Sequence, residues 1–381
     1  MNATHLLISL MRGLAAIEVA AAHLRSEMFP GLREISHPSL VYQLLAFATG
    51  FAHQAVVVFF LISGWLVGGS LLNKFAQQDR RVLRAYAIDR ATRLWTVLLP
   101  ALCLMLAIAC LIGEADPALF DVSANNELSA ASFAGNLMGL QNIWVKNFAG
   151  NYALWSLANE TWYYVQFPLL LIVLMGRSRL RQLGAATALV LLSASLPLPI
   201  TLYFALWLAG ALFSRVRIDC SNAVRTGLVL VAAACSVYFR MTGRNDDLEV
   251  DSFVQDLIYS LPLLAFLASM QLPLNQHSRA VRGIGRIAHL LSEFSFTLYV
   301  THIPMIKLMR YLGMQQFGRN RLAADAALDY AIYFGMLLAL MAFAYLSYLM
   351  FESHTFRIRR AVKGLFDARV KRPAVTTASA K

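Results

Sequence analysis

Residues 11–27 read MRGLAAIEVAAAHLRSE, an apolar helical run that carries arginines, glutamates and a histidine. The apolar run extends over about 5–27, which supplies the ~20 mostly apolar residues that a helix needs to cross a bilayer. Ionisable groups are costly at that depth, so they usually face the protein interior and mark a functional path. The stretch therefore predicts a first membrane helix with a functional polar face.

The composition of the whole chain agrees with a membrane protein. Of its 381 residues, 59% are hydrophobic and 14% are charged, whereas soluble domains carry about 25% charged residues. We expect an all-α polytopic membrane domain over residues 1–352 and a basic cytoplasmic tail over 353–381. No Lys or Arg precedes Arg12, which argues against a cleaved signal peptide. The four cysteines show neither metal nor disulfide spacing.

Ten segments are predicted to span the membrane, and the fifth and sixth are short. They cover residues 5–27, 52–73, 94–113, 156–176, 182–197, 200–214, 224–240, 253–272, 287–310 and 326–351. A further apolar stretch at 40–51 suggests an interfacial helix before the second span. The long segment 114–155 is rich in aromatic and asparagine residues, which suits a cap or lid over a site.

The distribution of Lys and Arg sets the predicted orientation. The inside segments are 74–93, 177–181, 215–225, 275–286 and the tail from 353, and the outside loops are 28–51, 114–155, 198–199, 241–252 and 311–325. With the N-terminus inside, the inside segments hold 23 Lys and Arg residues and the outside loops hold five. This asymmetry predicts that both termini are cytoplasmic, and it accounts for the net charge of +12 without a nucleic-acid partner.

Three polar residues are predicted in the outer half of their spans: His23, Glu160 and His302. A carboxylate near a histidine makes the imidazole a better general base. Arg12 lies eleven residues before His23, so the two share one helix face about 16 Å apart along the axis. Glu18 points elsewhere, and we expect it to meet a polar partner on a neighbouring helix. Snorkelling, an aromatic belt or helix packing would also account for each residue taken singly.

The sequence RRVLRAYAIDRATRLW places Arg81, Arg84, Arg90 and Arg93 before the third span. Arginines bind phosphates through paired N–H groups. The alternative is a positive-inside signal alone, and the same alternative is favoured for the basic tail RIRRAVKGLFDARVKR, which could also be an amphipathic, lipid-facing helix.

Six segments in order resemble the acyltransferase-3 family of multi-span enzymes that acylate sugars. They are RGLAAIEVAAAH (Arg12 to His23), VVVFFLISGWLV (with Ser63), RATRLW, WSLANETWYYVQFPLLL (with Trp155, Ser156 and Glu160), FSFTLYVTHIPMI (with Tyr299 and His302) and FESHTFRIRR (with Glu352). Together they run from residue 12 to residue 360. The resemblance implies a ten-helix fold and an acyl-CoA donor, most often acetyl-CoA.

The resemblance also implies His23 as the catalytic histidine and Arg12 as its partner. We add Glu160 to these catalytic residues, to orient an imidazole or bind the sugar. His23 is expected to act as base or to carry the acyl group briefly. The expected substrate-binding residues are Arg90, Arg93, Ser63, Trp155, Ser156, Asn159, Tyr299 and His302.

The implied partners are acyl-CoA, membrane lipids and a carbohydrate acceptor, which could be a polysaccharide, a lipopolysaccharide or a lipid-linked glycan. No metal is expected, and the expected location is a bacterial inner membrane. Two other classes fit membrane-depth charges. A carrier without chemistry is one, although no internal repeat is visible. A sensor that has lost turnover is the other, but retained Arg12, His23 and Glu160 argue against it.

Overall fold

The computed structural model describes residues 2–75, 81–112, 125–243, 250–274 and 278–371. It is 82% helical with almost no sheet, which confirms the all-α prediction. Within this described part, six helical stretches are long and apolar enough to cross a membrane. The chain is therefore an integral membrane protein. The count of ten spans and the cytoplasmic termini stay predictions.

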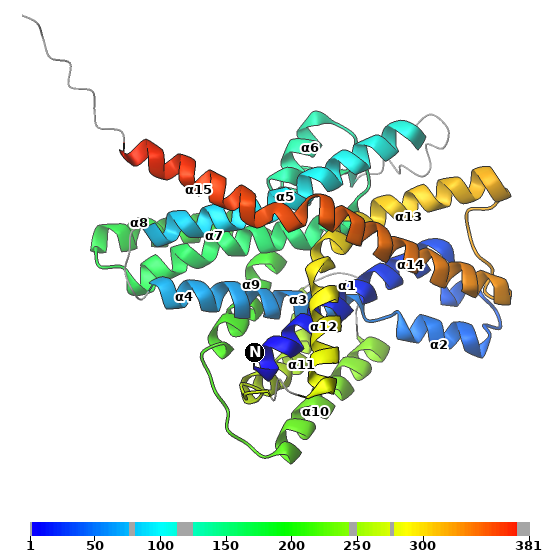
Figure 1. The fold of residues 1–381 in the computed structure, drawn as a ribbon, viewed down its shortest axis with the longest axis horizontal. Helices are drawn as coiled ribbons and strands as arrows, with labels where there is room; N and C mark the ends of the chain where they lie inside the picture. Colours follow the sequence, from blue (N-terminus) through cyan, green and yellow to red (C-terminus); the bar gives the residue numbers. More distant parts are fainter. Residues whose placement is uncertain (1, 76–80, 113–124, 244–249, 275–277, 372–381) are drawn as a thin grey trace, which may run out of the picture.

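The helices of the bundle overlap the predicted segments, and several of them extend beyond the predicted bounds (Figure 1). They are α1 (Ala3–Met28), α2 (Leu40–Ala48), α3 (Ala52–Ser63), α4 (Gly69–Phe75), α5 (Arg81–Ile112), α7 (Trp155–Met175), α8 (Arg179–Ser195), α9 (Leu198–Phe213), α10 (Asn222–Thr242), α11 (Val250–Ser269), α13 (Ser295–Phe317) and α14 (Ala327–Met350), with a 3-10 turn η1 (Leu32–Glu34) after α1. The apolar stretch at 40–51 forms the separate helix α2.

The predicted span 287–310 is wrong in its bounds, because two helices share it. Helix α12 covers Arg279–Glu293 and ends at Phe294, where α13 begins a new axis. Arg282, Arg286, His289 and Glu293 recur at helical spacing, so α12 carries a polar face along its length. That face explains why the apolar run is interrupted before residue 294.

Helix α1 packs against α3, α12, α13 and α14, so it lies inside the bundle. Its contact with α12 is close, since a Cβ on Gly13 would lie 2.4 Å from Cβ of Leu291. The polar partner predicted for Glu18 is a backbone group: the N–H of Phe51 donates to Oε1 over 2.8 Å. Phe51 is the N-cap residue of α3, where a carboxylate satisfies an otherwise unpaired N–H and complements the helix dipole.

Glycines bring α3 and α9 into backbone contact. A π-helical turn, η2 (Gly64–Gly68), follows Ser63 and leads into α4. A Cβ on Gly64 would lie 1.9 Å from the carbonyl oxygen of Trp207, and one on Gly210 would lie 2.2 Å from that of Leu61. Small residues at a helix–helix interface let membrane helices approach each other closely. The contact fixes Ser63 against α9.

The described part of the predicted cap, residues 125–154, packs against α5 and, at its end, against α13. It contains β1 (Asn126–Glu127), α6 (Ala130–Leu137), β2 (Asn147–Phe148), parallel to β1, and η4 (Tyr152–Leu154). Nδ2 of Asn151 donates to the carbonyl of Val300 over 3.3 Å, and the Tyr299 hydroxyl donates to the carbonyl of Ala153 over 2.9 Å. Residues 113–124 lie outside the described residues, as do 244–249 of the predicted outside loop 241–252.

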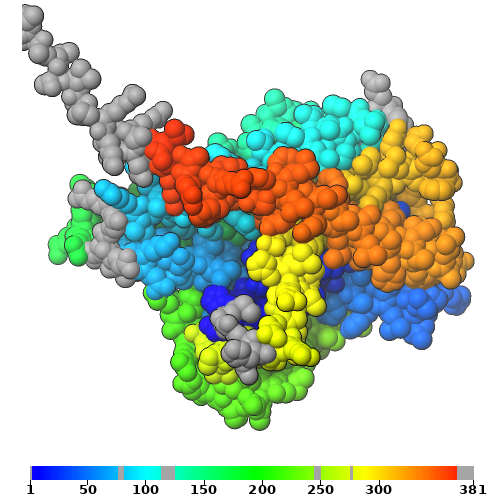
Figure 2. All heavy atoms as spheres, viewed as in Figure 1, coloured from blue at the N-terminus to red at the C-terminus, as the bar shows by residue number. Residues whose placement is uncertain are grey.

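The segment after residue 352 is more than a charged tail. A turn, η5 (Glu352–His354), leads into α15 (Thr355–Lys371), which packs against α5. Figure 2 shows α14 and α15 as one ridge across this face of the molecule. Residues 372–381 of the predicted tail lie outside the described residues.

Candidate active site

A cavity of about 690 Å³ lies between α1, α3, α4, α5, α7, α13 and α15. Most of the predicted site residues line it: Arg12, Ser63, Arg90, Arg93, Ser156, Glu160 and Tyr299. Residues separated by almost 300 positions thus line one cavity.

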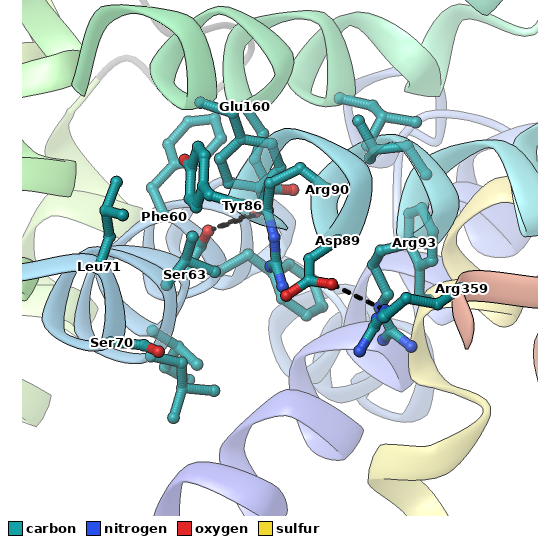
Figure 3. A pocket seen from close by; sticks show the side chains of 18 of the residues that line it. Phe60, Ser63, Ser70, Leu71, Tyr86, Asp89, Arg90, Arg93, Glu160 and Arg359 are labelled. Atoms are coloured by element: carbon teal, nitrogen blue, oxygen red, sulfur yellow. Dashed lines mark hydrogen bonds and ion pairs between the residues drawn. The ribbon is translucent and has the colours of Figure 1, made fainter. Parts of the chain in front are cut away.

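Ser63 and Glu160 form the polar centre of the cavity (Figure 3). The Ser63 hydroxyl donates to Oε1 of Glu160, and the Tyr164 hydroxyl donates to the same oxygen. Nε1 of Trp207 donates to Oγ of Ser63 over 3.1 Å. The serine oxygen is therefore held by one donor and one acceptor, with its position set by the glycine contact between α3 and α9.

Arginines surround this centre. The Arg12 guanidinium contacts the Ser292 carbonyl and Oγ of Ser295, both over 3.4 Å, so α1 is tied to the junction of α12 and α13. Arg93 pairs with the buried Glu352 over 2.7 Å. Arg90 lies over the ring of Tyr164, 5.6 Å from its centroid. The arginines that the sequence assigned to phosphate binding thus reach the same cavity.

His23 and His302 form a second polar group, outside the lining of the cavity. Nδ1 of His23 lies 2.8 Å from Nε2 of His302, and the two rings stack with centroids 5.1 Å apart. Nδ1 of His302 lies 3.2 Å from the carbonyl oxygen of Leu298. Tyr152 from the cap packs edge-on against His23 at 5.4 Å. The sequence predicted only a similar depth for the two histidines, and the structure shows that their side chains are in contact.

Of the two roles predicted for Glu160, orientation of an imidazole is not seen, because its carboxylate accepts hydrogen bonds from the hydroxyls of Ser63 and Tyr164. Binding of the sugar stays a prediction. Tyr299 lies between the cavity and the histidine pair. Its hydroxyl is 2.6 Å from Oγ of Ser156 at the cavity wall, and its ring centroid is 5.9 Å from that of His302.

Trp155 and Asn159 lie at the start of α7 and do not line the cavity. Asn159 is buried, and Trp155 packs against the hydrophobic core.

Several residues that line the cavity were not predicted from the sequence as site residues, among them Lys74, Tyr86, Asp89, Arg359 and Lys363. The signal on α5 was helical spacing, because Tyr86 precedes Arg90 and Asp89 precedes Arg93 by four residues each, on one face. Arg359 and Lys363 belong to the basic tail, for which a positive-inside signal was the favoured interpretation. Among the described residues, no group of three or more His, Cys, Asp and Glu could hold a metal ion.

A bundle of apolar helices that encloses a cationic cavity and a histidine pair defines an integral membrane protein with a polar site inside it. The family model described as an acyltransferase domain, type 3, matches residues 6–356, nearly the whole chain. The chain belongs to the acyltransferase-3 family and is a membrane acyltransferase. No match was found among curated proteins or solved structures.

Proposed function

We propose that the protein transfers an acyl group, acetyl as the first choice, from acyl-CoA to a hydroxyl of an exported or cell-surface glycan in a bacterial inner membrane. Family membership supports the acyl transfer. The cationic cavity supports a phosphate-bearing donor, since Arg12, Arg90 and Arg93 line it.

The contact between the two histidine rings is the observation that carries the proposed chemistry. A carbonyl oxygen only accepts, so Nδ1 of His302 donates to Leu298 and Nε2 of the neutral ring is an acceptor. Nδ1 of His23 then donates to that nitrogen, which leaves Nε2 of His23 unprotonated. His302 thus fixes the tautomer in which His23 is a base. Glutamate or aspartate fills this orienting role in many other sites.

The proposed transfer is a single displacement at the thioester carbon. The acceptor hydroxyl oxygen attacks that carbon, its proton moves to Nε2 of His23, the C–S bond breaks and CoA leaves as the thiolate. The thiolate then takes the proton from the imidazolium. Arg90 and Arg93 hold donor phosphates and Arg12 steadies the donor further in. The hydroxyls of Ser63, Ser156 and Tyr299 bind polar groups of the substrates.

The experiment uses purified protein, acetyl-CoA with a labelled acetyl group and a membrane glycan extract. We expect His23→Gln to lower the transfer rate by about 10²-fold or more, as loss of a general base does. The matched control is His289→Gln, because the His289 side chain is 73% exposed on α12. If folded His23→Gln protein transfers label as fast as wild type, the assigned base is wrong. If wild type transfers label from no acyl-CoA, the alternative that the protein is a membrane carrier without acyl-transfer chemistry is favoured.

A further inference from the structure

Three charged side chains meet where α15 packs on α5. Oδ1 of Asp89 lies 3.3 Å from Nε of Arg359 and 2.6 Å from Nζ of Lys363. Arg359 and Lys363 are four residues apart on α15, so they present both cations on one face. All three side chains line the cavity, and Figure 3 shows Asp89 and Arg359 facing each other at one end of it. Both cations lie beyond residues 6–356, which the family model matches.

The cavity carries an excess of positive charge. Its lining includes seven Lys and Arg side chains and two Asp and Glu side chains. Asp89 supplies one carboxylate to two cations, so this corner stays formally positive even with the ion pairs formed. Such a corner favours a multiply charged anion, and phosphate oxygens accept several charge-assisted hydrogen bonds at once.

Exposure distinguishes the rim of the cavity from its floor. The floor residues Ser156 and Tyr299 are 6% and 7% exposed. At the rim, the side chains of Arg359 and Lys363 are 25% and 35% exposed. An acyl-CoA molecule carries its thioester at one end and its adenosine 3′-phosphate at the other. A donor whose thioester reaches the floor therefore leaves the nucleotide end at the rim, beside α15.

We propose that Arg359 and Lys363 bind the 3′-phosphate of the donor and that Asp89 is the anion that pairs with them in its absence. The inference rests on the proposed acyl-CoA donor. A phosphate monoester carries about −1.5 to −2 charges at neutral pH, so it neutralises the two cations more completely than the single carboxylate of Asp89 does. Helix α15 is then part of the donor site and contributes to donor selectivity.

The test compares KM for acetyl-CoA with KM for its 3′-dephospho form in the full-length protein. We expect wild type to show a KM about tenfold or more higher for the dephospho donor, the size expected for hydrogen bonds between charged groups. The double variant Arg359→Gln/Lys363→Gln should raise KM for acetyl-CoA to a similar value and leave KM for the dephospho donor unchanged. Arg357→Gln is the matched control, since Arg357 is exposed on the same helix and does not line the cavity.

Asp89→Asn should act in the opposite direction and lower KM for acetyl-CoA, because the two cations lose their competing anion. Equal use of both donors by wild type, or a double variant that still discriminates between them, would overturn the inference. A higher KM for acetyl-CoA in Asp89→Asn would contradict the proposal that the Asp89 carboxylate and the 3′-phosphate compete for Arg359 and Lys363. Lys363→Gln alone repeats the comparison if the double variant does not fold. Transfer from neither donor by wild type would instead refute the proposed function, and the inference with it.

Discussion

Asp256 shows that an ionisable residue at membrane depth can hold helices together away from the cavity of the candidate active site. Its carboxylate is fully buried on α11. It accepts hydrogen bonds from the hydroxyls of Tyr203 on α9 and Tyr259, and both of its oxygens lie 2.9 Å from Nε2 of His53 on α3. One carboxylate thus joins three helices. A buried charge is tolerated where its partners are this complete.

We expect Asp256→Ala to lower the free energy of unfolding by about 3–5 kcal/mol, because it removes the buried carboxylate that His53, Tyr203 and Tyr259 share. The control is Asp219→Ala, whose side chain is 77% exposed and which should change stability by less than about 0.5 kcal/mol. Thermal and denaturant unfolding in detergent measure both.

The contact between His53 and Asp256 can be tested by a double-variant cycle. His53→Ala and Asp256→Ala should show a coupling of about 1 kcal/mol or more, because the two side chains are in direct contact in the core. Additive losses in the double variant would contradict a direct contact between the two side chains.

At the scale of elements, the contact between α3 and α9 positions the polar centre. Ser63 immediately precedes the π-turn, and Trp207 of α9 supplies both the carbonyl that meets Gly64 and the indole N–H that meets Ser63. The same backbone contact therefore controls helix packing and the orientation of the serine hydroxyl. π-turns are frequent at functional sites for this kind of reason.

Gly64→Ala should destabilise the protein by about 1–3 kcal/mol, since the added methyl meets a backbone oxygen that cannot rotate away. Gly184→Ala is the matched control, because nothing lies within 4 Å of a Cβ at that position of α8. It should be neutral or stabilising by about 0.5–1 kcal/mol. The midpoint of thermal unfolding in detergent is the measurement. Equal effects of the two substitutions would show that α3 and α9 are not in backbone contact.

At the scale of the whole molecule, the cavity is closed by segments from both ends of the chain. Arg12 comes from α1 and Arg359 from α15, with residues of α5, α7 and α13 between them. The predicted topology places the basic segments around Arg90 and α15 on the cytoplasmic side, where acyl-CoA is available. Orientation in the membrane is therefore central to the proposed function.

Cysteine labelling tests that orientation. In a chain whose four native cysteines are replaced, Leu128→Cys should react with a membrane-impermeant maleimide added to intact cells, because residue 128 falls in a predicted outside loop and is 51% exposed. Asp219→Cys, in a predicted inside segment, should react only after the membrane is opened. The reverse pattern would invert the predicted topology.

The sequence by itself determined the class of fold, the approximate position of many helices and the main polar residues that line the cavity. Apolar length and charge asymmetry are local properties, and helical spacing places Arg12 and His23 on one face without any knowledge of neighbours. Where apolar and polar periodicities overlapped, at 287–310, the sequence missed the break between α12 and α13.

Only the tertiary structure decided which polar groups meet. In the tertiary structure His23 contacts His302, and the Glu160 carboxylate accepts hydrogen bonds from Ser63 and Tyr164. Glu18 accepts a hydrogen bond from the Phe51 N–H, and α15 lines the cavity. These pairings depend on which helices are neighbours and on how they are rotated, and both are set by side-chain packing between segments far apart in the chain. No periodicity within one segment carries that information.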